Sequence, residues 1–252
     1  MRSSVFIVVV QLLLVGSASA DTCFTFQTDR AALLAGASKK LEHRVDAWSG
    51  VSGARLEFGD FVWLYRAAEN ELLLVEHTTK TYRVFPIPFS VLDYQPEAKK
   101  EEFRQYHLSL APQTQLEGPG GVETVGEHSA RRWVATTTVA GLGSFEIEAW
   151  ISPDLGERCA SLERLFKARS ALDPLYGEAE RQILDLPGCM VRQIVQRRRE
   201  IRGGSITETR LAGIREVPPE PGRYAPPDGY REVPVDQKIV GGFVEGQPLP
   251  SQ

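Results

Sequence analysis

Three of the four histidines in this chain directly follow a glutamate, an arrangement that would suit acid–base catalysis. The pairs are Glu42-His43, Glu76-His77 and Glu127-His128. We expect the first two on strands and the third on or near one, and consecutive strand side chains point to opposite faces. A general base must lie within hydrogen-bonding reach of the group it serves. The favoured interpretation is therefore that these are ordinary strand or turn histidines.

Common enzyme motifs do not occur in the sequence after Ala20. It has no G-x-S-x-G nucleophile elbow, no H-E-x-x-H motif and no phosphate-binding glycine loop. No two cysteines or histidines lie at the spacing of zinc ligands. A catalytic triad assembled from distant residues is still compatible with the sequence. Nothing positive points to one, so we expect a protein that is not an enzyme and uses no metal or cofactor.

The only basic cluster is Arg197 to Arg199. On a strand, Arg197 and Arg199 share one face and Arg198 lies on the other. Such a cluster could bind an anionic headgroup or a phosphate. A solvated sheet face is the usual role of such a cluster, and it is the interpretation we prefer.

The segment 58–65 is unusually rich in aromatic residues. It is either plain hydrophobic core or the wall of an apolar cavity between sheet and helices that accepts a lipid or acyl chain. Ligand pockets are concave and mostly apolar, but a filled core has the same composition. If the cavity exists, we expect its lining to include Phe58, Phe61, Trp63, Ile147 and Ile194.

Strands must position most of these residues. Residues 41–48 alternate apolar and polar side chains, and residues 54–67 are rich in aromatic and β-branched types. Residues 71–86 predict two strands around a turn near 77–80. Short connections between consecutive strands favour an antiparallel meander. Residues 96–111 predict a helix.

A second run of strands follows, with a hairpin turn at Ala140 to Gly143. On its second strand, Glu146, Glu148 and Trp150 share the face that we expect to be wet or partly wet, because the sheet should be covered on one side only. The opposite face should point to the core, and it carries Phe145, Ile147, Ala149 and Ile151.

Helices and two late strands complete the predicted domain. Residues 162–172 carry apolar side chains at helical spacing. A second helix should start with Asp173 as its N-cap and Pro174 at its first position. Strands follow at 189–201 and 206–217. This order predicts an α+β fold, with a large curved antiparallel sheet and helices packed on one face.

The first twenty residues have the three parts of a secretory signal peptide. Arg2 is the positive part, Val5 to Val15 is the apolar run, and Ala18-Ser19-Ala20 is the cleavage site. The run is shorter than the ~20 residues that a membrane-spanning helix needs, so an anchor is disfavoured. Cys23 does not directly follow the small residues, as a lipoprotein signal requires. We expect a soluble protein that is periplasmic or secreted.

The length after cleavage suits one large domain or two small ones, and we expect a single domain at 21–233. A Pro/Gly-rich tail at 234–252 follows it. Loss of Arg2 takes the formal net charge from −4 to −5. A mildly acidic chain argues against general nucleic-acid binding.

Three cysteines, Cys23, Cys159 and Cys189, would meet an oxidising compartment after export. The odd number leaves one free or paired between chains. Cys159 and Cys189 flank the predicted helical segment and are the preferred disulfide. The alternative is that all three are small buried apolar residues.

Four stretches carry a family resemblance in a fixed order. They are "LLLVEHTTKTYRVFP", "ETVGEHSARRWVATTTVAGLGSFEIEAWIS", "LPGCMVRQIV" and "REVPPEPGRYAPPDGYREV". Together they resemble an exported family of unknown function that is related to the periplasmic lipoprotein-carrier superfamily (LolA, LolB, LppX and RseB type). The resemblance implies an unclosed half-barrel of antiparallel strands with helices on the concave face. It also implies an apolar cavity for a lipid or a lipid-modified protein, without dedicated binding residues.

These observations support two main hypotheses. The first is a non-enzymatic periplasmic binding or carrier protein for a lipid, acyl chain or lipoprotein. The alternative is an envelope protein-interaction or sensor module with a filled core and no ligand. A ligand-sized cavity between sheet and helices would separate them. A hydrolase with a hidden triad ranks third, and the sequence does not determine the oligomeric state.

Overall fold

A computed structural model of the chain describes residues 20–32, 41–140, 142–199 and 203–235. Residues 1–19 of the predicted signal peptide and 236–252 of the predicted tail lie outside the described residues. Within the described residues, no helix is long and apolar enough to cross a membrane.

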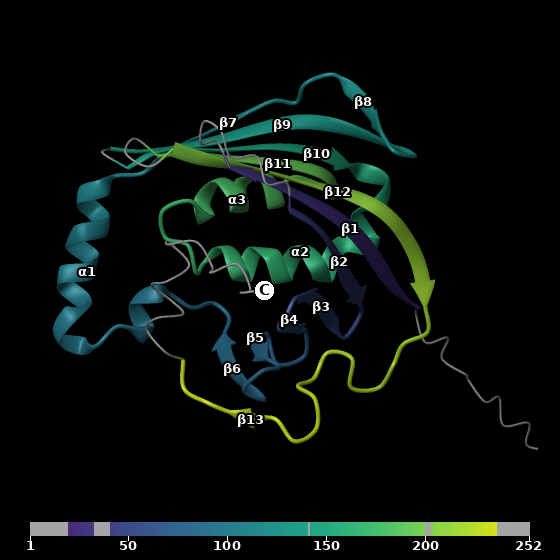
Figure 1. Cartoon of the computed structure of the whole chain (residues 1–252), viewed down its shortest axis with the longest axis horizontal. Coiled ribbons are helices and arrows are strands. Elements are labelled where there is room, and N and C mark those ends of the chain that lie inside the picture. Colours follow the sequence, from purple (N-terminus) through teal and green to yellow (C-terminus); the bar gives the residue numbers. More distant parts are fainter. Residues whose placement is uncertain (1–19, 33–40, 141, 200–202, 236–252) are drawn as a thin grey trace, which may run out of the picture.

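A single mixed sheet dominates the described chain (Figure 1). Three α-helices accompany it in the described residues: α1 (Glu97–Leu110), α2 (Gly156–Ser170) and α3 (Gly177–Leu184). The 3₁₀ helices η1 (Val91–Tyr94) and η2 (Pro153–Leu155) are short. The strands are β1 (Asp21–Ala32), β2 (Leu41–Gly50), β3 (Gly53–Phe58), β4 (Phe61–Arg66), β5 (Glu71–Glu76), β6 (Thr81–Pro86), β7 (Gln113–Glu117), β8 (Val122–Val125), β9 (His128–Val139), β10 (Gly143–Ser152), β11 (Cys189–Arg199), β12 (Gly203–Val217) and β13 (Arg231–Glu232).

The strand order is β13-β6-β5-β4-β3-β2-β1-β12-β11-β10-β9-β7, with β8 also paired to β9. All pairings are antiparallel except that of β13 with β6. Within the described residues the edge strands β13 and β7 do not pair, so the sheet stays open. The predicted α+β fold with a curved, mainly antiparallel sheet is consistent with this arrangement.

Strand β1 was not among the predicted elements, yet it joins the two halves of the sheet. It pairs with β2 on one side and with β12 on the other. Its partner Arg210 on β12 lies 183 positions from Gln27 in the chain. A pairing this distant leaves no local sequence signal, because strand patterns report burial and not the partner.

Helices α2 and α3 lie in the hollow of the curved sheet (Figure 1). The buried face of α2 includes Cys159, Leu162 and Leu165, which pack with apolar residues of β1 to β5. Helix α3 buries Ala179 and Ile183 against β9 and β10. The predicted amphipathic helix is confirmed over residues 162–170, where the apolar positions recur on one side of α2, while Leu172 lies beyond the end of the helix.

The start of α3 differs from the prediction. Asp173 does act as a local cap, since its Oδ1 accepts hydrogen bonds from the backbone N–H of Leu175 and Tyr176 at 3.1 and 3.0 Å. These bonds close a turn, and the helix begins only at Gly177. Pro174 therefore lies in the turn before the helix.

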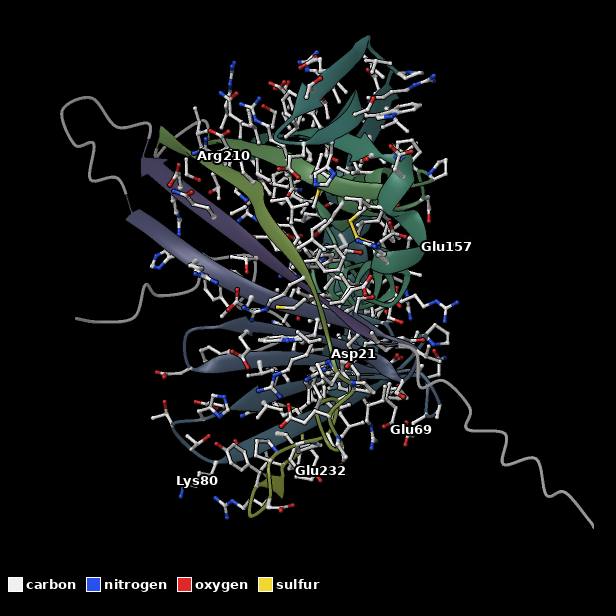
Figure 2. All side chains as sticks on the ribbon, turned by 90° about the vertical axis from the view of Figure 1, so that its right-hand side faces the viewer. Asp21, Glu69, Lys80, Glu157, Arg210 and Glu232 are labelled. Atoms are coloured by element: carbon white, nitrogen blue, oxygen red, sulfur yellow. A yellow bond between two sulfur atoms is a disulfide. The ribbon has the colours of Figure 1, made fainter. Side chains whose placement is uncertain are left out.

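The outer face of β4 and β5 is more buried than predicted. Val62, Leu64, Leu73 and Val75 are at most 1% exposed there, and Tyr230 packs against them. The C-terminal segment covers this face, and β13 adds to the edge at β6, at the lower end of the view in Figure 2, where Lys80 and Glu232 are labelled. The backbone N–H of Arg231 donates to the carbonyl of Lys80 at 3.2 Å. The expectation of a sheet covered on one side only was wrong for these two strands.

Candidate functional site

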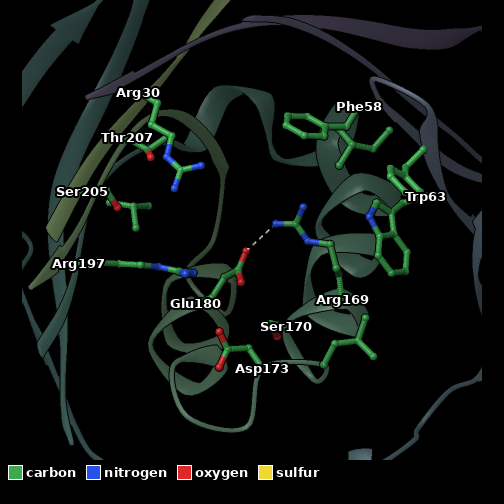
Figure 3. Close-up of a pocket in the computed structure, with 14 residues that line it drawn as sticks. Arg30, Phe58, Trp63, Arg169, Ser170, Asp173, Glu180, Arg197, Ser205 and Thr207 are labelled. Carbon is green, nitrogen blue, oxygen red and sulfur yellow. Dashed lines mark hydrogen bonds and ion pairs between the residues drawn. The ribbon is translucent and has the colours of Figure 1, made fainter. Parts of the chain in front are cut away.

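A pocket of about 350 Å³ opens between the α2–α3 connection and the sheet (Figure 3). Its residues come from β1, β3, β4, β11 and β12 on the sheet side and from α2, α3 and their connection on the helix side. They are Arg30, Leu56, Phe58, Phe61, Trp63, Arg169, Ser170, Leu172, Asp173, Glu180, Val195, Arg197, Ser205 and Thr207.

The β3–β4 hairpin supplies an aromatic wall. Its register sets Leu56 opposite Trp63 and Phe58 opposite Phe61. Because side chains alternate along a strand, all four point to the same face. Gly59 begins the two-residue turn with φ of 59°, a conformation that glycine adopts without strain. Trp63 is 4% exposed and Phe58 is 38% exposed, so the wall runs from the core to solvent.

The opposite wall is polar and basic. Thr207 on β12 pairs with Arg30 on β1 and with Val195 on β11, so these three residues form one row across the sheet. Ser205 pairs with Arg197 in the next row on the same face. The guanidinium of Arg197 lies 5.2 Å from the ring centre of Phe145, a cation–π contact that holds it in place.

The helix side of the pocket carries two acids that already have partners. Arg169 donates to Glu180 Oε1 at 3.2 Å. Asp173 accepts the two backbone hydrogen bonds of its own turn. In Figure 3 the side chains of Arg30, Arg169 and Arg197 point toward the middle of the pocket. Since the lining holds three arginines and two acids, its formal charge is +1.

Three of the five residues predicted to line a cavity come together here. Phe58, Phe61 and Trp63 all line the pocket. Ile147 does not line it, because α3 covers it and leaves it 1% exposed in the core. Ile194 does not line it either. It neighbours Val195, which does, so strand alternation places Ile194 on the opposite face.

The sequence did not identify the basic residues of the pocket as site residues. Arg197 belongs to the predicted basic cluster, but it is half-buried in the pocket and not on a solvated sheet face. Arg30 lies on the unpredicted strand β1. The alternation that separates Arg197 from Arg198 was readable in the sequence, but which of the two faces is covered by helices was not.

Cys159 and Cys189 form a disulfide, as the sequence favoured. Their Cα atoms are 5.7 Å apart, a normal separation for such a bond. The bond ties α2 to the first residue of β11. Cys23 is a buried free thiol, and burial raises its pKa. The disulfide is consistent with an exported protein, although the signal peptide itself is not described.

Among the three Glu-His pairs, the structure gives a side-chain partner for His77. His77 Nδ1 lies 2.7 Å from the hydroxyl of Tyr230, so its partner is not the neighbouring Glu76. No cluster of three or more His, Cys, Asp or Glu side chains that could hold a metal ion occurs among the described residues.

Glu163 on α2 is an ionisable group in an apolar gap beside the disulfide. Leu162, Phe166 and Ile183 share this gap. Burial raises the pKa of Glu163 to about 7, and the nearby Lys167 only partly opposes the shift. A carboxyl group with a raised pKa in the folded state favours folding least when it is ionised.

We therefore expect stability to fall as pH rises from about 4.5 to about 7 and then to level off for this group. Glu163→Gln should remove this slope and raise the free energy of unfolding at pH 8 by about 1–2 kcal/mol. This is less than the full shift would give at ~1.4 kcal/mol per pH unit, because solvent screens the partly accessible side chain. Urea unfolding at pH 5 and pH 8 measures the effect. The exposed Glu102→Gln on α1 is the control, and equal slopes in both variants would contradict the prediction.

No family model matches the chain, and no curated protein sequence matches it. Similar solved structures include PNGF-II in space groups C2 and P21, each at a TM-score of 0.44 with 10% and 11% identity. They cover 88% and 90% of this chain but 33% of their own, so this chain spans about a third of their length. Another is the LolA superfamily protein NE2245 from Nitrosomonas europaea, at a TM-score of 0.30 and 8% identity, covering 82% of this chain and 90% of that one. Similarity this low leaves the relationship to the lipoprotein-carrier superfamily a prediction.

Proposed function

We propose that this chain is a non-enzymatic binding or carrier protein of the cell envelope. It holds a lipid, an acyl chain or the acyl part of a lipoprotein in the pocket between sheet and helices. The observation that carries the proposal is an open pocket of about 350 Å³ beside the apolar wall of Leu56, Phe58, Phe61 and Trp63. This volume lies at the lower end of the ~300–1,000 Å³ found for ligand sites, which suits a single acyl chain.

This pocket is open, whereas the rest of the interior is filled by side chains. Beneath α2 and α3 the side chains form continuous clusters, with Leu165 and Ala179 fully buried. The pocket opens at the C-terminal end of α2, where the aromatic wall reaches solvent. The alternative, an interaction module with a filled core, does not account for this open space.

Native mass spectrometry of the exported protein, followed by lipid extraction, tests the proposal. We expect a stoichiometric lipid or acyl species, a chain that starts at Asp21 and the loss of two hydrogens for the disulfide. A clean ligand-free mass, together with no binding of a fluorescent fatty-acid probe, would overturn the proposal. That result would favour the protein-interaction module.

Phe61→Glu tests the location of the site. A carboxylate on the aromatic wall must lose water when an acyl chain binds, which is costly. We expect at least a tenfold loss of affinity for the fatty-acid probe, or about 1.4 kcal/mol. Val51→Glu makes the same change at a residue that is 77% exposed and away from the pocket. Equal affinities in the two variants would place the ligand elsewhere.

A further inference from the structure

The basic wall of the pocket indicates what the ligand carries at its polar end. We infer that the ligand is a single-chain amphiphile with an anionic head, which Arg30 and Arg197 bind while the apolar chain lies along the aromatic wall. The inference rests on the proposed function and adds the chemistry of the head.

The two arginines are close enough to bind one anion. Arg30 and Arg197 lie on strands separated by β12 and are two residues apart in register. With strands ~4.8 Å apart and a rise of ~3.4 Å per residue, their Cα atoms are roughly 12 Å apart. Both side chains point into the pocket (Figure 3), so an anion between their guanidinium groups can contact both.

Neither guanidinium is neutralised by a carboxylate among the described residues. Glu180 forms its ion pair with Arg169, and Asp173 accepts hydrogen bonds from the backbone N–H groups of its own turn. The guanidinium carbon of Arg197 lies 5.2 and 6.0 Å from the ring centres of Phe145 and Tyr176. Neither ring contact is a hydrogen bond to a carboxylate, so the guanidinium keeps N–H groups that can donate to a ligand.

Hydroxyl groups complete the polar end. Thr207 is paired with Arg30, and Ser205 is paired with Arg197, on the same face of the sheet. Hydroxyls and paired guanidinium groups together suit a carboxylate, phosphate or sulfate head. The opposite wall consists of Leu56, Phe58, Phe61 and Trp63. These side chains carry no charge that could bind such a head, but they can pack against a hydrocarbon chain.

A series of ligands with the same twelve-carbon chain separates the head from the tail. Isothermal titration calorimetry of the full exported protein would use laurate, dodecyl phosphate, 1-dodecanol and dodecyltrimethylammonium, each below its micelle concentration. We expect the two anions to bind about tenfold tighter than the alcohol and the cation to bind weakest, because charge-assisted hydrogen bonds are roughly twice as strong as neutral ones. Inorganic phosphate serves as the head without a tail.

Arg30→Gln and Arg197→Gln should each remove most of the advantage of the anions over 1-dodecanol, so that the ratio of the two affinities falls from about ten toward one. Arg198→Gln is the matched control, since it removes the same charge from the neighbouring, exposed position on the opposite face. Urea unfolding of each variant shows that it is folded.

The outcomes separate the inference from the proposed function. Equal affinities for the anionic, neutral and cationic ligands would contradict the inference that the pocket selects an anionic head. The proposed carrier function would remain. An equal loss in Arg198→Gln would also contradict the inference, because the effect would then be one of overall charge. If inorganic phosphate binds as tightly as dodecyl phosphate, the hydrocarbon tail contributes nothing to the affinity. That result would contradict both the acyl-carrier function and the inferred amphiphilic ligand. No binding of any chain overturns the proposed function itself.

Discussion

Replacing both Cys159 and Cys189 by alanine is expected to lower the free energy of unfolding by about 3–4 kcal/mol. The disulfide closes a loop with a sequence separation of 30, and the loop restricts the unfolded chain. The loop contains most of α2 and all of α3, the helices that cover the sheet and form one side of the pocket. This loss is a large fraction of the ~5–15 kcal/mol that stabilises a typical domain.

Denaturant unfolding of the double variant measures this loss, and the wild type under a reducing agent should show a similar one. Cys23→Ala is the control, because this thiol is equally buried but forms no disulfide. It should cost about 1 kcal/mol for the atoms removed from the core. A double variant as stable as the Cys23 variant would contradict a stabilising role for the bond.

Gly177→Ala is expected to destabilise the protein by about 2 kcal/mol and to weaken binding of the proposed acyl ligand. A Cβ at this position would lie 2.0 Å from the backbone oxygen of Ser170, so the chain must move. Overpacking of this kind typically costs ~1–3 kcal/mol, which outweighs the ~1 kcal/mol that alanine gains over glycine in a helix. Binding should weaken because Ser170, Leu172 and Asp173 line the pocket and lie next to this contact.

Gly213→Ala is the matched control, because a Cβ there would meet nothing within 4 Å. Denaturant unfolding and the affinity for laurate should be measured on both variants. If Gly177→Ala is as stable as Gly213→Ala, the two helices are not held as close as this contact requires. If it is less stable but binds laurate normally, the α2–α3 connection does not shape the pocket.

Local features of the fold could be predicted because their causes are local. The turn near 77–80 separates β5 from β6, and α1 occupies most of the predicted range 96–111. β9 ends at Val139 and β10 starts at Gly143, so the two strands break where the hairpin turn was expected. Each depends on neighbouring residues only: strand alternation, turn formers or helical spacing.

The candidate site could be predicted only in part. The aromatic content of 58–65 identified Phe58, Phe61 and Trp63, because a hairpin places residues from both of its strands on one face. Ile147 and Ile194 do not line this pocket, for different reasons. Alternation assigns Ile147 to a face but does not reveal that α3 fills the space above it. Ile194 differs from the lining residue Val195 by one position, and local sequence cannot show which strand face the helices cover.

The sequence alone determined the type of most elements, the α+β class and the pair of cysteines available for a disulfide, because each follows from local pattern or composition. Only the tertiary structure decided that β1 joins the two halves of the sheet and that Arg30 and Arg197 face one pocket. It also decided that the C-terminal segment covers β4 and β5. These features depend on contacts between residues up to 196 positions apart, such as Asp21 and Val217. Hydrophobic burial is not directional, so the pattern of a segment reports that it is buried but not which distant segment covers it.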